Sequence, residues 1–118
     1  MKESSKLEQQ LILGKIVEFK MPKEFDLNNS YDIKEYIYTE AFDKGYIHVL
    51  LDFSGTEYID STGLGTIVAL HRQSLMKAGS IAFVNFDENI KKLLKMTALD
   101  RVLNIFESEK DAIEFLNR

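Results

Sequence analysis

Apolar side chains along the chain follow two kinds of pattern, one typical of buried strands and one typical of helices. Nearly continuous apolar runs occupy residues 46–53 (YIHVLLDF) and 81–86 (IAFVNF), and both are rich in branched and aromatic side chains. Such runs are typical of strands that are covered on both faces of a sheet. They predict two central strands.

Apolar residues at helical spacing predict helices at 30–44, 62–77 and 88–96, the first two stopped by Gly45 and Gly79. The expected buried stripe of the second helix consists of Leu64, Ile67, Val68, His71 and Leu75. Polar residues that favour helix starts precede each segment. They are Asn28, Asn29 and Ser30 for the first helix, Asp87 for the third, and Ser108 with Asp111 for a last helix that ends the chain.

The two ends of the chain add short strands. Residues 7–21 contain two apolar stretches around Gly14 and predict a hairpin, or a strand with an edge strand, that ends at Pro22. Residues 102–106 (VLNIF) predict one more edge strand. Strands that alternate with helices predict an α/β fold with a mostly parallel sheet of four to five strands and about four helices packed on it.

The length of 118 residues is that of one domain, which we place at 7–118 after a polar, flexible segment 1–6. The chain has no cysteine and a formal charge of −4, so disulfides, thiol catalysis and most zinc sites are excluded. It has no basic block for nucleic acid, no apolar stretch long enough to span a membrane, and no secretory signal. We therefore expect a cytoplasmic protein that is monomeric when free and binds neither nucleic acid nor membrane.

Two enzymatic interpretations fail on their residues. The stretch LDFSGT is similar to the signature of haloacid-dehalogenase-type phosphatases, but Ser54 stands where the general acid must follow the nucleophile Asp52. A serine hydroxyl does not titrate near neutral pH and cannot act as that acid. Asp60-Ser61-Thr62-Gly63 differs from the aspartic protease loop by one residue in spacing, and a helix follows it. A small phosphohydrolase therefore has little support.

The two histidines give no sign of a catalytic triad or a metal site. His71 lies in the apolar stripe of its helix, where a buried histidine with satisfied hydrogen bonds is the usual case, and His48 lies within a predicted strand. The glycines at 63 and 65 match no phosphate-binding fingerprint. We expect no enzyme, no metal and no cofactor.

The stretch EYIDSTGLGTIVAL, residues 57–70, is the most informative part of the chain. One of Asp60, Ser61 and Thr62 suffices to cap the following helix, so the other two are surplus. A helix N-terminus favours an anion, and Gly63 is expected to leave room there for a partner surface or a phosphoryl group. A phosphate on Ser61 would add about −1.5 to −2 charges beside Asp60.

The segment FSGTEYIDSTGLGTIVALHRQ resembles the signature of anti-sigma factor antagonists, the bacterial branch of the STAS domain family. In that signature the first hydroxyl residue after the aspartate is phosphorylated, which implies Ser61. The resemblance extends to KEFDLNNS and to LLKMTALDRVLNIFESEKDAIEFL. The partner-binding residues that it implies are Glu24, Asp26, Asp60, Ser61, Thr62, Gly63, Leu64 and Gly65.

The resemblance also implies a switch between partners. The unphosphorylated protein binds an anti-sigma factor that is a serine kinase and thereby frees the sigma factor; phosphorylation ends the binding, and a PPM-type serine phosphatase reverses it. The same partners with an output other than a sigma factor remain an alternative. The sequence departs from the family pattern at Lys23 and Ala98, where glycine is usual.

Overall fold

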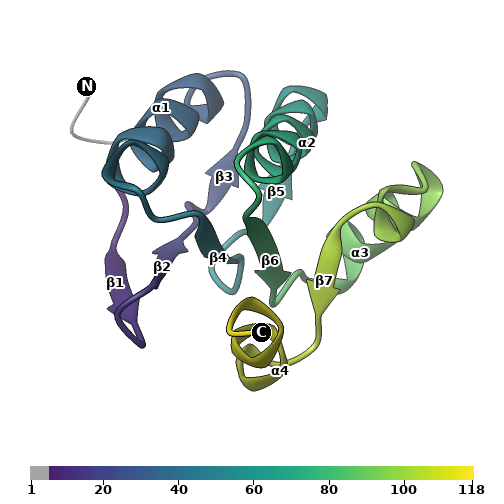
Figure 1. The fold of residues 1–118 in the computed structure, drawn as a ribbon. Helices are drawn as coiled ribbons and strands as arrows, with labels where there is room; N and C mark the ends of the chain where they lie inside the picture. Colours follow the sequence, from purple (N-terminus) through teal and green to yellow (C-terminus); the bar gives the residue numbers. More distant parts are fainter. Residues whose placement is uncertain (1–5) are drawn as a thin grey trace.

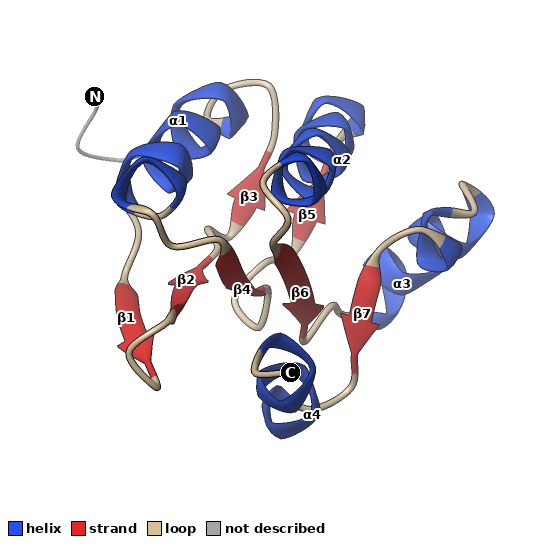
Figure 2. Cartoon of the chain, viewed as in Figure 1, coloured by secondary structure: helices blue, strands red, loops and turns tan. Residues whose placement is uncertain are grey.

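The computed structural model describes residues 6–118, so the predicted flexible segment lies, apart from Lys6, outside the described part. A five-stranded sheet with the order β1-β2-β4-β6-β7 forms its centre (Figures 1 and 2). The strands are β1 (Gln9–Ile12), β2 (Ile16–Lys20), β4 (His48–Asp52), β6 (Ser80–Val84) and β7 (Asn104–Phe106). Only β1 runs antiparallel to its neighbour, so the predicted N-terminal hairpin and mostly parallel sheet are confirmed.

Helices cover both faces of this sheet. They are α1 (Ser30–Glu40), α2 (Ser61–Met76), α3 (Glu88–Met96) and α4 (Glu109–Leu116). The larger core lies between the sheet and α1, α2 and α3, whereas α4 packs on the opposite face (Figure 1). Val49 and Leu51 face the larger core and Leu50 faces α4, as the alternation of side chains along a strand requires.

Two of the predicted helix caps form as expected, and the one before α1 differs. Asp87 accepts a hydrogen bond from the Ile90 backbone N–H at 2.8 Å, and the Ser108 hydroxyl accepts one from Asp111 at 3.1 Å. Before α1, Asn29 occupies the cap position, but its side-chain oxygen accepts from the Asp26 N–H at 3.0 Å instead of from the helix. Asn29 therefore stabilises the turn that leads into α1.

The first helix is shorter than its pattern predicts. The α-helix ends at Glu40, and a 3-10 turn, Phe42–Lys44, carries the chain to Gly45, whose φ of 88° ends it. A second 3-10 turn, Leu99–Arg101, follows α3, and Ala98 before it has a φ of 61°. Ala98 thus adopts the left-handed conformation for which glycine is the usual residue.

A second, two-stranded sheet was not predicted. It consists of β3 (Glu24–Phe25) and β5 (Tyr58–Ile59), which pair in parallel. The expected stripe of α2 was wrong at its end, because Leu75 is 57% exposed while Leu70 and Ser74 are buried. Among the described residues no helix has both the length and the apolar character needed to cross a bilayer.

Candidate functional site

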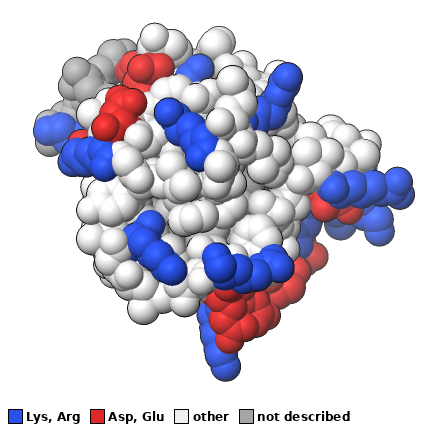
Figure 3. All heavy atoms as spheres, in the orientation of Figure 1, with Lys and Arg blue, Asp and Glu red and all other residues white. Residues whose placement is uncertain are grey.

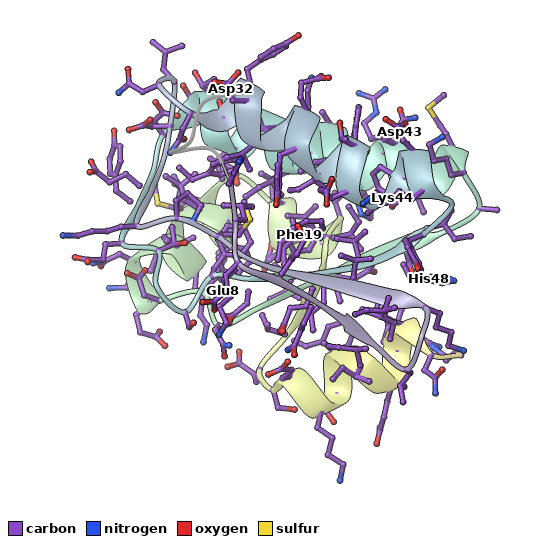
Figure 4. The ribbon with its side chains drawn as sticks, turned by 90° about the vertical axis from the view of Figure 1, so that its left-hand side faces the viewer. Glu8, Phe19, Asp32, Asp43, Lys44 and His48 are labelled. Atoms are coloured by element: carbon purple, nitrogen blue, oxygen red, sulfur yellow. The ribbon has the colours of Figure 1, made fainter. Side chains whose placement is uncertain are left out.

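The loops that follow β2, β4 and β6 meet at one edge of the sheet, because parallel strands end on the same side. After β4 the chain forms a short loop, then β5, and then enters α2 at Ser61. Figure 4 shows the two ends of the molecule: Asp32, in the first turn of α1, lies at one, and His48, where β4 begins, at the other. The small sheet of β3 and β5 joins the starts of α1 and α2 at the Asp32 end.

Asp60 is the cap of α2 and also ties it to the turn before α1. Its Oδ1 atom accepts the Gly63 backbone N–H at 2.8 Å, and its Oδ2 atom accepts the Leu27 backbone N–H at 3.0 Å. The hydrogen bond from Gly63, followed by those from Leu27 and Thr62, holds the pKa of Asp60 below its ordinary value. The ionised carboxylate of Asp60 therefore accepts hydrogen bonds from two separate backbone segments, the start of α2 and the turn before α1.

Ser61 is the first residue of α2, and both it and Thr62 are exposed. The Ser61 hydroxyl makes no hydrogen bond to any of residues 6–118, because Asp60 already fills the capping position. The prediction that one polar residue caps the helix and the others are surplus is thus confirmed for Asp60 and Ser61. The free hydroxyl stands at the positive end of a helix of 16 residues.

The expectation that Gly63 opens the turn toward a partner is wrong. Gly63 is buried, and a Cβ on it would collide with the Phe25 carbonyl oxygen and lie 2.9 Å from the Cγ2 atom of Ile59. Leu64 is buried in the larger core. The glycine that leaves the outer surface open is Gly65, whose missing side chain would meet nothing within 4 Å.

The two acidic residues of the preceding turn differ in their surroundings. Asp26 builds the turn itself, since its Oδ1 atom accepts the Asn28 backbone N–H at 2.9 Å. Glu24 is exposed on β3, in register with Tyr58 on β5. Lys23 is exposed and pairs with Glu57 at 3.7 Å.

The rejected phosphatase residues serve a structural purpose. Asp52 is 6% exposed, and it accepts hydrogen bonds from Asn85 at 2.9 Å and from the Ser54 backbone and hydroxyl at 2.9 and 3.1 Å. Burial alone would raise the pKa of Asp52, but these bonds outweigh it and hold the pKa below the ordinary value. Lys20 lies 3.7 Å away. These hydrogen bonds hold the loop after β4 against the residue that follows β6.

The histidines lie away from Ser61. His48 Nδ1 lies 3.0 Å from the Ser80 hydroxyl, where β4 and β6 begin, at the opposite end of the parallel strands. His71 is 6% exposed, but its Nδ1 atom has no hydrogen-bond partner among residues 6–118, so within this part of the chain the expectation of a satisfied histidine was wrong for that atom. Burial lowers the pKa of His71, which favours the neutral ring.

Leu27 and Tyr58 were not among the residues predicted for the site. They are 73% and 53% exposed, and both belong to segments that adjoin Asp60. In the sequence the only signal was an apolar residue within the polar turn DLNNS and an aromatic residue just before Ile59.

The chain is similar in sequence and in fold to known proteins. The family model described as the STAS domain matches residues 9–112. A Thermotoga maritima protein named "Putative anti-sigma factor antagonist" is 32% identical over 96 residues, which cover 81% of this chain and 85% of that protein.

Solved structures have the same fold. The crystal structure of the Thermotoga maritima protein TM1081, which carries the same description, superposes with a TM-score of 0.87 at 28% identity and covers 95% of each chain. The structure of the anti-sigma factor antagonist SpoIIAA in its unphosphorylated form superposes with a TM-score of 0.72 over 95% of this chain and 98% of that one. At 18% identity, this second match shows the fold alone.

Proposed function

Since the chain belongs to the STAS domain family, we propose that it is an anti-sigma factor antagonist whose binding is switched off by a phosphate on Ser61. The observation that carries the proposal is the state of Ser61, which is exposed and whose hydroxyl bonds to no described residue, beside a cap that Asp60 already supplies. A phosphoacceptor has to be reachable by a kinase, and its modification must leave the fold intact. Ser61 meets both requirements.

The partner is an anti-sigma factor that is also a serine kinase. Unphosphorylated, the chain binds this partner and the sigma factor is released. The kinase then transfers the γ-phosphoryl group of ATP: the Ser61 Oγ–P bond forms, the bond to the β-phosphate breaks, ADP leaves, and the hydroxyl proton passes to solvent or to a base of the kinase. A PPM-type serine phosphatase hydrolyses the ester and restores the binding form, so the chain is substrate and contact surface in the cytoplasm and its partners are the catalysts.

The charge of the phosphate explains why binding ends. It brings about −1.5 to −2 charges next to Asp60, whose pKa is low and which is therefore ionised at neutral pH. The N–H groups at the start of α2 stabilise this charge while it is hydrated. A partner that covers Ser61 removes that water, and the resulting penalty of several kcal/mol corresponds to about a thousandfold loss of affinity.

The site assignment is tested by mass spectrometry. The chain is incubated with ATP and its purified anti-sigma factor kinase, and we expect one added phosphate, on Ser61. Ser61→Ala should accept none, and the matched variant Thr62→Ala should accept one as the wild type does. A phosphate on another residue, or none from a kinase that binds the chain, would exclude Ser61 as the acceptor.

A further inference from the structure

The strand β1 forms an open edge of the five-stranded sheet. It pairs with β2 on one side, and among residues 6–118 no strand pairs with its outer side (Figure 1). The Lys20 backbone N–H donates to the Glu8 carbonyl at 2.9 Å. Because bonded and non-bonded residues alternate along an antiparallel pair, the N–H and C=O groups of Gln9 and Leu11 point away from β2. These four groups make no hydrogen bond within residues 6–118.

This edge lacks the features that usually keep the strands of two molecules apart. Natural edge strands are commonly protected by a charged residue, a proline or a bulge. The four residues of β1, QQLI, include no charge and no proline, and they pair with β2 without a bulge. Leu11 lies opposite Val17, which faces the larger core, so the Leu11 side chain points to the same face of the sheet, where it is 51% exposed. The edge is therefore able to accept another strand.

A hollow of about 270 Å³ lies beside this edge, between β1 and the end of α1. Apolar and polar side chains line it together, namely Gln9, Gln10, Leu11, Val17, Glu40, Lys44 and Tyr46. The charges on its rim are already paired, since Lys44 lies 3.2 Å from Glu40 and Gln9 also donates to Glu40. An apolar side chain can enter such a hollow without leaving a charge unpaired.

We propose that β1 pairs with β1 of a second copy of this chain, in an antiparallel, two-fold symmetric dimer with Gln10 at the axis. Residues whose backbone points outward must pair with each other, so Gln9 lies opposite Leu11 of the second copy, and the reverse. All four free backbone groups of each copy are then bonded. A register centred on Leu11 would instead need Leu13, whose φ of 54° is not that of a strand.

The register also explains why the partner is a second copy. It brings the Leu11 side chain of each copy next to Gln9 of the other, on the face where the hollow lies, so each copy supplies one apolar side chain and one hollow. No residue of β1 brings a charge against the facing strand.

The dimer leaves the candidate phosphoacceptor uncovered. The helix α2, which begins at Ser61, lies against β6, and β2 and β4 separate β6 from β1. The dimer therefore goes beyond the proposed function and does not depend on it.

Sedimentation equilibrium of the purified full chain, at concentrations from about 1 μM to about 1 mM, tests the dimer. We expect the mean mass to rise with concentration from that of one chain toward that of two, because an interface built on one short strand is weak. Leu11→Lys, which brings a charge to the hollow, should raise the dimer Kd by at least about tenfold. The matched control Leu75→Lys changes a leucine of α2 that is 57% exposed, and it should leave Kd unchanged.

Cysteine cross-linking tests the register. The chain has no cysteine, so one can be introduced alone. At the axis the two copies of residue 10 form a non-hydrogen-bonded pair with Cα atoms about 4.5 Å apart, which is within the range for a disulfide. Gln10→Cys should therefore give a covalent dimer with oxidised glutathione, whereas Leu75→Cys should not.

The outcomes separate the dimer from its register. A chain that stays monomeric up to about 1 mM, as expected from the sequence alone, would overturn the dimer. A dimer that Leu11→Lys leaves intact would show that another surface forms it and would overturn the role of β1. A dimer that is lost in Leu11→Lys but is not cross-linked in Gln10→Cys would overturn the register.

Discussion

A serine stands at the start of α2 and another directly before α4, and the two serines have different tasks. Ser108 is itself the cap of α4, and its hydroxyl accepts the Asp111 N–H at 3.1 Å. In α2 the cap is Asp60, and Ser61 stands one position later with a hydroxyl that bonds to none of the residues that the structure describes. A serine that the helix does not need can be modified without loss of the helix.

The two helix starts also differ in what their caps hold. The bond of Ser108 is local, between residues three apart, whereas Asp60 also binds the backbone of Leu27, 33 residues earlier in the chain. The start of α2 is therefore a junction of two loops, and the start of α4 is an ordinary helix end. Substitutions at either helix start should change the stability of the protein. Only substitutions at the start of α2 should also alter phosphorylation or partner binding.

The largest effect should come from Gly63→Ala, because the added Cβ would collide with the Phe25 carbonyl oxygen, which cannot move without disturbing β3. We expect a loss of about 3 kcal/mol or more in the free energy of unfolding, measured by urea denaturation. Gly65→Ala, in the same helix but facing open space, should instead gain about 0.5–1 kcal/mol. Equal responses of the two variants would show that the junction is not close-packed.

The stability of α4 should depend on pH, and the stability of α2 should not. Burial raises the pKa of Glu18, on β2, to about 7 from its ordinary value of 4.5, and the neighbouring carboxyl of Glu109 in the first turn of α4 adds to the rise. Gln10 donates a hydrogen bond to Glu18, and Asp52 adds further negative charge. Figure 3 shows acidic side chains gathered over α4.

The pKa of Glu18 is higher in the folded chain than in the unfolded chain. The stability that the protonated Glu18 contributes is therefore fully present below pH 4.5 and is lost as the pH rises through about 7. We expect the free energy of unfolding to fall by about 3 kcal/mol at most between pH 5 and pH 8, and hydrogen exchange in α4 to become faster. Glu18→Gln should remove this slope. Asp60, whose pKa is lowered, stays ionised over the same range, so α2 should keep its protection. A slope that persists in Glu18→Gln would assign it to another group.

The smallest and most selective effects separate the two serines directly. Ser108→Ala should lower the free energy of unfolding by about 1 kcal/mol, because α4 loses its cap, and should leave phosphorylation unchanged. Ser61→Ala should change stability by less than about 0.5 kcal/mol and abolish phosphorylation. Thermal denaturation and kinase assays on the same two variants check this pair. The reverse pattern would assign the capping role to Ser61.

The order of strands and helices was predictable because its signals are local. The buried strands around Val49 and Phe83, and the caps at Asp87 and Ser108, are each encoded within a few neighbouring residues. The candidate phosphoacceptor was also visible, as a run of polar residues longer than a helix cap requires.

The packing of the site was not predictable, since it depends on residues far apart in the chain. The strands β3 and β5 have two residues each, too few for a pattern, and only their pairing defines them. That pairing also places the Phe25 carbonyl oxygen against Gly63, which reverses the role expected for this glycine. The exposure of Leu27 follows from the same turn and has no signal in its own neighbourhood.

The central claim is that a phosphate on Ser61 ends binding to the anti-sigma factor, and a comparison of affinities tests it most directly. The chain is prepared with and without phosphate on Ser61, and Kd for the purified anti-sigma factor is measured for both by calorimetry with ADP. We predict about a thousandfold weaker binding for the phosphorylated form, with Ser61→Asp weakened in the same direction and Ser61→Ala binding like the unmodified chain. Equal affinity of the phosphorylated and unmodified forms would contradict the account.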